Sequence, residues 1–388
     1  MKATFTELHD VSLITPRAYT DTRGQGRTVA PSGSIRIHTI DYLRGLFALS
    51  ILVYHYATWG GYARFGTSVL HKLGIYAVCA FYVISGISFG YIYRRLRPNW
   101  AGVWSFAIKR FFRLWPLYAI ATLGAILLAL PARPKLSWIL ANLTLTFGLI
   151  KPTAYFAAGG WSIGNEVAFY CLFPAAIILL RKSQWAFLPF FATSLGVAWW
   201  YAFVRLDPTH TLASQWAVYI RPENHLFLFL AGVLVSSWIG KISLLPWVSY
   251  LALILAALIF VLLPLGEDEI SIVTLWPRFA YGAICIAVCA IGALGRWPLP
   301  ENADRALEWL GLTSYSIYLL HPIVYLSLER VVRQPVITAL IALPVSLLTA
   351  HWVYRKIEAP IIRVGKSVAA RGSAAASDDT TTITKVLA

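Results

Sequence analysis

Ten apolar stretches of 17 to 24 residues divide this chain, and they restrict its fold more than any other feature. A helix of about 20 apolar residues is long enough to cross the hydrocarbon core of a bilayer. Helices or closed barrels are the structures that satisfy their backbone hydrogen bonds in lipid. The pattern therefore predicts an all-α integral membrane protein, a bundle of about ten transmembrane helices. The predicted helices cover residues 37–59, 70–93, 111–131, 161–180, 185–205, 224–240, 246–264, 272–294, 309–329 and 336–356.

The charge content agrees with this prediction. Only 13% of the residues are charged and 58% are hydrophobic, whereas about 25% of the residues in a soluble domain are charged. The formal net charge of +16 would suggest a nucleic-acid partner in a soluble protein. Here the basic residues cluster between the apolar stretches, which is the pattern that orients membrane helices. We therefore expect the lipid bilayer as a partner and no nucleic acid.

The distribution of charge also predicts the orientation of the helices. Loops rich in Lys and Arg stay on the cytosolic side, which places both termini inside and the acidic run 267–269 outside. A weaker stretch at 136–151 would reverse the later helices if it crossed, so we expect it to lie partly in the membrane or on its outer face. The basic residues placed inside by this topology are Arg94, Arg95, Arg97, Lys109, Arg110, Arg113, Arg181, Lys182, Lys241, Arg355 and Lys356.

Composition divides the chain into three parts. Residues 1–36 are polar, without the apolar core of a cleavable signal peptide, and are expected to form a cytosolic tail. Residues 37–361 form the predicted transmembrane domain. Residues 362–388 are polar and rich in Ala, Ser and Thr, which favours a flexible cytosolic tail.

Two ionisable residues, Arg44 and His55, lie inside the first apolar stretch. Arginine at the middle of a bilayer costs roughly 2.5–3.5 kcal/mol on insertion scales, so such residues usually have a function. Their spacing of eleven residues corresponds to about 16 Å along a helix, within roughly 20° of the same face. Arg44 suits an anion, and His55 can take a proton near neutral pH. A structural pair of Arg44 with Asp41, and a His55 bonded to a backbone carbonyl, remain open alternatives.

Further polar residues accompany the other stretches. Arg110 and Arg113, three residues apart, point the same way on a helix and suit a polyphosphate from the cytosol, although lipid headgroups are an alternative. Glu166 starts the predicted helix 161–180 and is expected at a depth similar to that of His55, where it could orient the imidazole or bind a sugar hydroxyl. His321 lies in the middle of helix 309–329, where a bonded core histidine is the alternative to a functional one.

The chain has four cysteines, and all of them fall inside apolar stretches. A buried cysteine usually behaves as a small hydrophobic residue. We therefore expect neither a disulfide framework nor a metal site from Cys79, Cys171, Cys285 and Cys289.

Five motifs together resemble the acyltransferase-3 family of bacterial membrane O-acyltransferases. The first helix holds IDYLRGLFALSILVYH at 40–55, similar to the family pattern of Arg, ten residues and His. FYVISGI at 81–87 resembles the Ser-Gly motif of the second helix. The remaining three motifs, in the expected order, are KRFFRLWPLY at 109–118, GWSIGNEVAFYCLFP at 160–174 and SYSIYLLHP at 314–322.

The resemblance implies transfer of an acyl group, commonly acetyl, from cytosolic acyl-CoA to a hydroxyl of a carbohydrate outside the bacterial inner membrane. It implies no permanently bound cofactor, no metal, and glycan-export machinery as a candidate partner. His55 would act as general base, with Glu166 positioning His55 or the acceptor, and Arg44, Arg110 and Arg113 would bind acyl-CoA. The residues expected to support the site or bind the acceptor are Asp41, Ser85, Gly86, Trp161, Tyr318 and His321.

Several alternatives remain open. A multi-span transporter or flippase of a lipid-linked sugar would also use buried charges and a basic cytosolic face. Such transporters often have repeated halves and interrupted helices, and we find neither in the sequence. For the enzyme, direct transfer and an acyl-histidine intermediate both fit the residues, and the sequence does not distinguish acetyl from succinyl or one carbohydrate acceptor from another.

Overall fold

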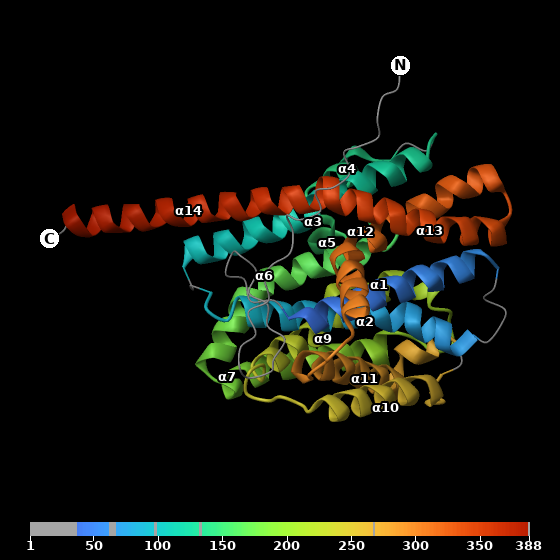
Figure 1. Cartoon of the computed structure of the whole chain (residues 1–388), viewed down its shortest axis with the longest axis horizontal. Helices are drawn as coiled ribbons and strands as arrows, with labels where there is room; N and C mark the ends of the chain where they lie inside the picture. Colours follow the sequence, from blue (N-terminus) through green and yellow to red (C-terminus); the bar gives the residue numbers. More distant parts are fainter. Residues whose placement is uncertain (1–36, 62–66, 97–98, 132–133, 267, 387–388) are drawn as a thin grey trace, which may run out of the picture.

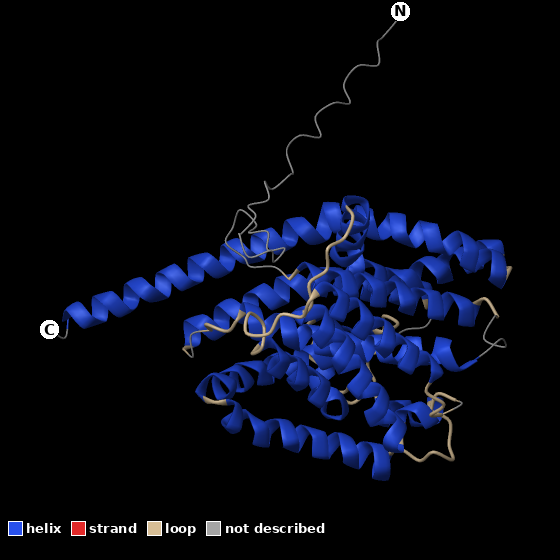
Figure 2. Ribbon diagram, turned by 60° about the horizontal axis from the view of Figure 1, so that its bottom comes forward, coloured by secondary structure: helices blue, strands red, loops and turns tan. Residues whose placement is uncertain are grey.

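A computed structural model describes residues 37–61, 67–96, 99–131, 134–266 and 268–386, with side chains described except at 67–68 and after 372. The cytosolic tail predicted at 1–36 lies outside these residues. Helices dominate the described part of the chain, in which Figure 2 shows no β-strand. Most of the long helices run roughly side by side across Figure 1. The all-α architecture expected from the apolar pattern is therefore confirmed.

Each of the ten apolar stretches forms a helix. The helices are α1 (His38–Trp59), α2 (Thr67–Ile92), α3 (Trp100–Leu128), α6 (Gly160–Lys182), α7 (Gln184–Trp200), α9 (Pro222–Ser236), α10 (Pro246–Leu262), α11 (Leu275–Leu294), α12 (Glu301–Val332) and α13 (Pro335–Val353).

Six of the described helices are long and apolar enough to cross a membrane, and a bent pair that ends in α9 makes up to seven. The number of ten crossings is therefore not confirmed by length and composition. The helix α10 has only 17 residues, and α1 and α12 contain the polar residues Arg44, His55 and His321. The features that mark a site in α1 and α12 are thus also the features that lower their hydropathy.

The weaker stretch 136–151 forms two short helices, α4 (Leu136–Leu143) and α5 (Phe147–Ile150). Because eight helical residues extend about 12 Å, neither helix can cross a bilayer. The backbone of α5 lies against α6, where a Cβ added to Gly148 would be 2.3 Å from the carbonyl oxygen of Gly164. This segment therefore covers the start of α6.

The C-terminal region differs from the prediction of a flexible tail at 362–388. After the π-helical turn η5 (Tyr354–Glu358), the helix α14 (Ala359–Val386) continues and extends well beyond the bundle in Figure 1. Its first part packs on α3, where Gly365 touches Phe112. Alanine is the best helix former, so the Ala-rich composition that suggested a loose tail is compatible with a helix.

Two pairs of glycines allow four helices to pack backbone against backbone. A Cβ at Gly86 of α2 would lie 2.0 Å from the carbonyl oxygen of Phe229, and Gly232 of α9 faces the carbonyl of Val83. In the same way, a Cβ at Gly311 of α12 would lie 2.4 Å from the carbonyl oxygen of Asp41 in α1, and one at Gly45 of α1 would lie 2.7 Å from the backbone nitrogen of Gly311. Small residues commonly allow such close approach between membrane helices. These contacts fix the depth and rotation of α1, α2, α9 and α12.

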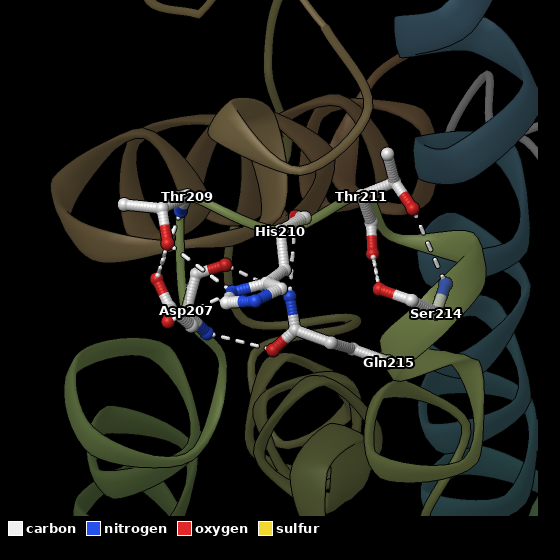
Figure 3. Close-up of polar contacts among 6 residues, drawn as sticks. All are labelled: Asp207, Thr209, His210, Thr211, Ser214 and Gln215. Carbon is white, nitrogen blue, oxygen red and sulfur yellow. Dashed lines mark hydrogen bonds and ion pairs between the residues drawn. The ribbon is translucent and has the colours of Figure 1, made fainter.

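The link between α7 and α9 contains the π-helical turn η2 (Tyr201–Arg205), the 3₁₀ turn η3 (Ala213–Gln215) and α8 (Trp216–Tyr219). Its polar side chains bond largely to one another (Figure 3). Asp207 accepts hydrogen bonds from the backbone N–H and the hydroxyl of Thr209, and the side-chain amide of Gln215 contacts the backbone of Asp207. This exposed cluster therefore stabilises the link. A last 3₁₀ turn, η4 (Ser271–Val273), precedes α11.

Candidate active site

A cavity of about 900 Å³ lies among α1, α2, α3, α6, α12 and the start of α14. Two acidic side chains, Asp41 and Glu166, line it together with six basic ones. We call it the basic cavity because cations outnumber anions along its wall. The basic residues that line it are Arg44, Arg95, Lys109, Arg110, Arg113 and Lys366.

Arg44 lines the basic cavity and is held by two neighbours. Its guanidinium donates to Oδ1 of Asp41 at 2.8 Å, one turn earlier in α1, and to the hydroxyl of Ser88 in α2 at 3.0 Å. The pair with Asp41 that the sequence left open is therefore present. Because the Arg44 side chain is still 23% exposed, this bond orients the guanidinium while leaving part of it at the cavity wall.

Arg110 and Arg113 both line the basic cavity, but their partners differ. Within the described residues no carboxylate pairs with Arg110, whose Nε is enclosed without a partner and whose Nη2 donates to the hydroxyl of Tyr93 at 3.3 Å. Its guanidinium lies over the ring of Phe89, 4.7 Å from the centroid. Arg110 is thus a positive charge held by aromatic rings and still able to bind an anion.

Arg113 instead forms an ion pair with Glu358, a residue that the sequence did not single out. The carboxylate of Glu358 also accepts a hydrogen bond from the hydroxyl of Ser316 at 2.7 Å, and its side chain is only 2% exposed. Glu358 ends the π-helical turn η5, and π-helical turns frequently occur at functional sites. The sequence signal that could have identified Glu358 is a carboxylate just after the last apolar stretch.

Glu166 lies in the basic cavity, not beside His55 as the sequence suggested. Oε1 of Glu166 accepts a hydrogen bond from Ser85 at 2.7 Å, and Oε2 accepts one from Tyr170. Ser85 is one helical turn from Ser88, the partner of Arg44, so Glu166 shares the depth of Arg44. The reason is that α6 begins inside the bundle, where its first six residues, 160–165, are buried. The expected depth assumed that this helix starts at the membrane surface.

His55 and His321 are hydrogen-bonded to each other across α1 and α12. Nδ1 of His55 lies 2.8 Å from Nε2 of His321, and Nδ1 of His321 lies 3.0 Å from the carbonyl oxygen of Ile317. A carbonyl oxygen can only accept a hydrogen bond, so Nδ1 of His321 carries a proton. When both rings are neutral, Nε2 of His321 therefore accepts a hydrogen bond from Nδ1–H of His55. The basic lone pair of His55 is therefore on Nε2.

The remaining nitrogen of this histidine pair is open. Nε2 of His55 has no hydrogen-bond partner among the described residues, and it is not one of their enclosed, unpartnered atoms. The indole of Trp59 stacks on the imidazole, with ring centroids 4.9 Å apart and planes at 4°. The ring is thus held on one face and at one edge, while its basic nitrogen remains accessible.

Tyr318 connects the basic cavity with the histidine pair. It lines the cavity, and its ring centroid lies 6.4 Å from that of His321, one turn later in α12. Its hydroxyl contacts the hydroxyl of Ser162 at 2.8 Å and the carbonyl of Gly159 at 3.0 Å. Neither His55 nor His321 lines the cavity itself, so Tyr318 forms the wall between the two.

Not all of the expected site residues come together. Asp41, Ser85 and Tyr318 line the basic cavity, whereas Gly86 faces the backbone of α9 and serves helix packing. Trp161 is buried among aromatic rings, with its centroid 5.5 Å from that of Trp216. Gly86 and Trp161 therefore do not line the cavity. No group of three or more metal-ligating side chains occurs within the described ranges.

Comparison with known proteins gives two matches. A family model described as an acyltransferase domain, that of the acyltransferase-3 family, matches residues 37–355. Acyltransferase MdmB of Streptomyces mycarofaciens is 32% identical over 167 residues, which make up 39% of this chain and 42% of that protein. The match therefore spans about two-fifths of the length of this curated relative. No solved structure matches the chain.

Proposed function

Since this chain belongs to the acyltransferase-3 family of membrane acyltransferases, we propose that it moves an acyl group, acetyl in the simplest case, from acyl-CoA to a hydroxyl of a carbohydrate. The family is one of acyltransferases, so the transporter of a lipid-linked sugar is set aside. We further propose that it acts in a bacterial inner membrane, with the donor entering from the cytosol and the acceptor from outside.

The basic cavity suits the donor. Coenzyme A carries several phosphate charges on one end and a long thin arm that ends in the thioester. Arg110 has no carboxylate partner in the described chain, and Lys109 and Lys366 lie on the same wall, so these cations can bind phosphate groups. Arg113, neutralised by Glu358, shapes the wall beside them.

The inner part of the cavity suits the arm of the donor. Arg44 and His55 are eleven residues apart in α1, about 16 Å along the helix, a length that an extended arm can span. Because Tyr318 forms the wall between the cavity and the histidine pair, its side chain must move aside for the thioester to meet His55. Glu166 lies along this path, bonded to Ser85. We therefore propose that Glu166 contacts the donor arm rather than the imidazole of His55. The amide N–H groups of that arm can donate hydrogen bonds to the carboxylate of Glu166.

His55 is the proposed general base. Its accessible Nε2 takes the proton of the acceptor hydroxyl while the oxygen attacks the thioester carbonyl. When the tetrahedral intermediate collapses, the C–S bond breaks and the imidazolium returns the proton to the departing sulfur, which leaves as free CoA thiol. His321 holds the required tautomer of His55 through its Nε2. The single observation that carries this proposal is the open Nε2 of an imidazole fixed at its other nitrogen.

The test uses the purified full chain in lipid nanodiscs with radiolabelled acetyl-CoA and neutral sugars as acceptors. We expect release of free CoA thiol that depends on the sugar, together with label in the sugar. A His55→Gln variant should bind acetyl-CoA with unchanged affinity and transfer label about 10²- to 10⁴-fold more slowly. His210→Gln, an exposed histidine in the link of Figure 3, is the matched control. Transfer by His55→Gln at the wild-type rate would contradict the assignment.

A further inference from the structure

Three side chains from separate elements meet around the hydroxyl of Tyr54, the residue that precedes His55 in α1. They are Tyr54 of α1, His71 of α2 and Glu269 of the loop between α10 and α11. The hydroxyl of Tyr54 donates to Oε1 of Glu269 at 2.8 Å, and Nε2 of His71 lies 3.7 Å from the same oxygen. None of the three lines the basic cavity. They form a separate polar group, which we call the outer cluster.

The outer cluster keeps unused hydrogen-bonding capacity. The side chain of Glu269 is 38% exposed, and within the described part of the chain its Oε2 accepts no hydrogen bond. The distance from Nε2 of His71 to Glu269 is too long for a direct hydrogen bond. Nδ1 of His71 is enclosed without a partner, which favours the tautomer with the proton on Nε2. A carboxylate acceptor and an imidazole donor therefore face the same small volume.

Aromatic rings connect the outer cluster to the proposed base. The ring centroid of Tyr54 lies 5.2 Å from that of His55, and the indole of Trp59 also stacks on His55. The Tyr54 ring can lie against α2 only because residue 74 is glycine, where a Cβ would be 2.5 Å from Cδ1 of Tyr54. Aromatic side chains provide an apolar face with a polar tip, which suits the mixed C–H and O–H surface of a sugar.

The geometry points to the outer cluster as an acceptor subsite, which binds hydroxyls of a neutral carbohydrate next to the hydroxyl presented to Nε2 of His55. Oε2 of Glu269 accepts from one sugar hydroxyl, and Nε2–H of His71 donates to a neighbouring one. A carboxylate in this position disfavours an anionic sugar and also the phosphates of the donor, since placing like charges together opposes the wrong ligand. This inference rests on the proposed function, and it adds which residues select the acceptor.

The experiment compares the wild type with Glu269→Gln and Tyr54→Phe in nanodiscs. The probes are acetyl-CoA and methyl glycosides of glucose, galactose and N-acetylglucosamine, with glucuronic acid as the anionic sugar. Loss of a hydrogen bond to a charged group should raise the KM for the neutral acceptor about 10- to 100-fold. The KM for acetyl-CoA should stay unchanged, and glucuronic acid should become a better acceptor of Glu269→Gln than of the wild type.

Asp268→Asn is the matched control, because it removes one carboxylate from the same loop, and Asp268 already accepts from the backbone N–H of Ser271. Its acceptor KM should stay near that of the wild type. An equal rise of both KM values, or an unchanged acceptor KM in Glu269→Gln, would overturn the subsite while leaving the acyltransferase intact. If the wild type releases CoA but acylates no sugar, the carbohydrate part of the proposed function fails, and the subsite fails with it. If Glu269→Gln does not fold, Tyr54→Phe serves as the test instead. It removes the hydroxyl that donates to Glu269, and its KM for the neutral acceptor should also rise.

Discussion

Arg113 of α3 and Glu358 of η5 form an ion pair across 245 residues of sequence, and the Glu358 side chain is only 2% exposed. The same carboxylate accepts from Ser316 of α12. Glu358 thus joins α3, α12 and η5 at the wall of the basic cavity. It also balances the charge of the Arg113 guanidinium.

Glu358→Ala should destabilise the protein strongly. Removing one partner of a buried ion pair leaves the other charge uncompensated, which typically costs about 3–5 kcal/mol. The midpoint of thermal unfolding in detergent measures the effect. The exposed pair Arg305–Glu301, with side chains 70% and 75% exposed, provides the control Glu301→Ala, expected to cost about 0–1 kcal/mol. Equal shifts of the two midpoints would show that burial of Glu358 does not matter.

Replacing the two histidines of the pair should affect turnover to different degrees. His55→Ala removes the proposed general base, so kcat should fall about 10²- to 10⁴-fold. His321→Ala leaves the base of His55 in place but removes the partner of its Nδ1, so kcat should fall less than in His55→Ala. Single-turnover transfer rates at saturating acetyl-CoA measure both effects. A larger loss in His321→Ala than in His55→Ala would reverse the roles assigned here.

Arg110→Gln should weaken donor binding more than catalysis. Arg110 has no carboxylate partner among the described residues, and a charge-assisted bond to phosphate contributes about 1.5–3 kcal/mol, or roughly a 10- to 100-fold change in Kd. Titration of the purified protein with acetyl-CoA should show this loss of affinity. With dephospho-CoA as the ligand, the difference in Kd between Arg110→Gln and the wild type should be smaller. Arg305→Gln, an exposed arginine that does not line the cavity, should bind like the wild type.

Gly86→Ala should disturb the contact between α2 and α9. The added Cβ would lie 2.0 Å from a backbone oxygen, so the two helices must separate, and overpacking of this kind costs about 1–3 kcal/mol or more. Gly196→Ala in α7 is the opposite case, since no atom lies within 4 Å of the added Cβ, and it should stabilise by about 0.5–1 kcal/mol. We expect the thermal unfolding midpoint to fall in Gly86→Ala and to rise in Gly196→Ala.

The sequence predicted the individual helices well, because helix formation and membrane insertion depend on neighbouring residues. The apolar stretches became helices, and the spacing of Arg44 and His55 placed both on α1. The motifs indicated the family that the comparison confirmed. The segment 136–151, expected to lie partly in the membrane or on its outer face, forms helices of eight and four residues, and its position relative to the membrane stays a prediction.

The tertiary structure decided how these helices meet. The partner of His55 is His321, 266 residues later, and Glu166 contacts Ser85 at the depth of Arg44 because α6 begins inside the bundle. Such contacts depend on the depth and rotation at which helices dock, which glycine pairs such as Gly86 and Gly232 set. The periodicity of residues along one helix predicts which side chains share a face of that helix, but not which other helix packs against that face. The sequence therefore determined which side chains carry charge on which helix, and the packing between helices determined which of them share a site.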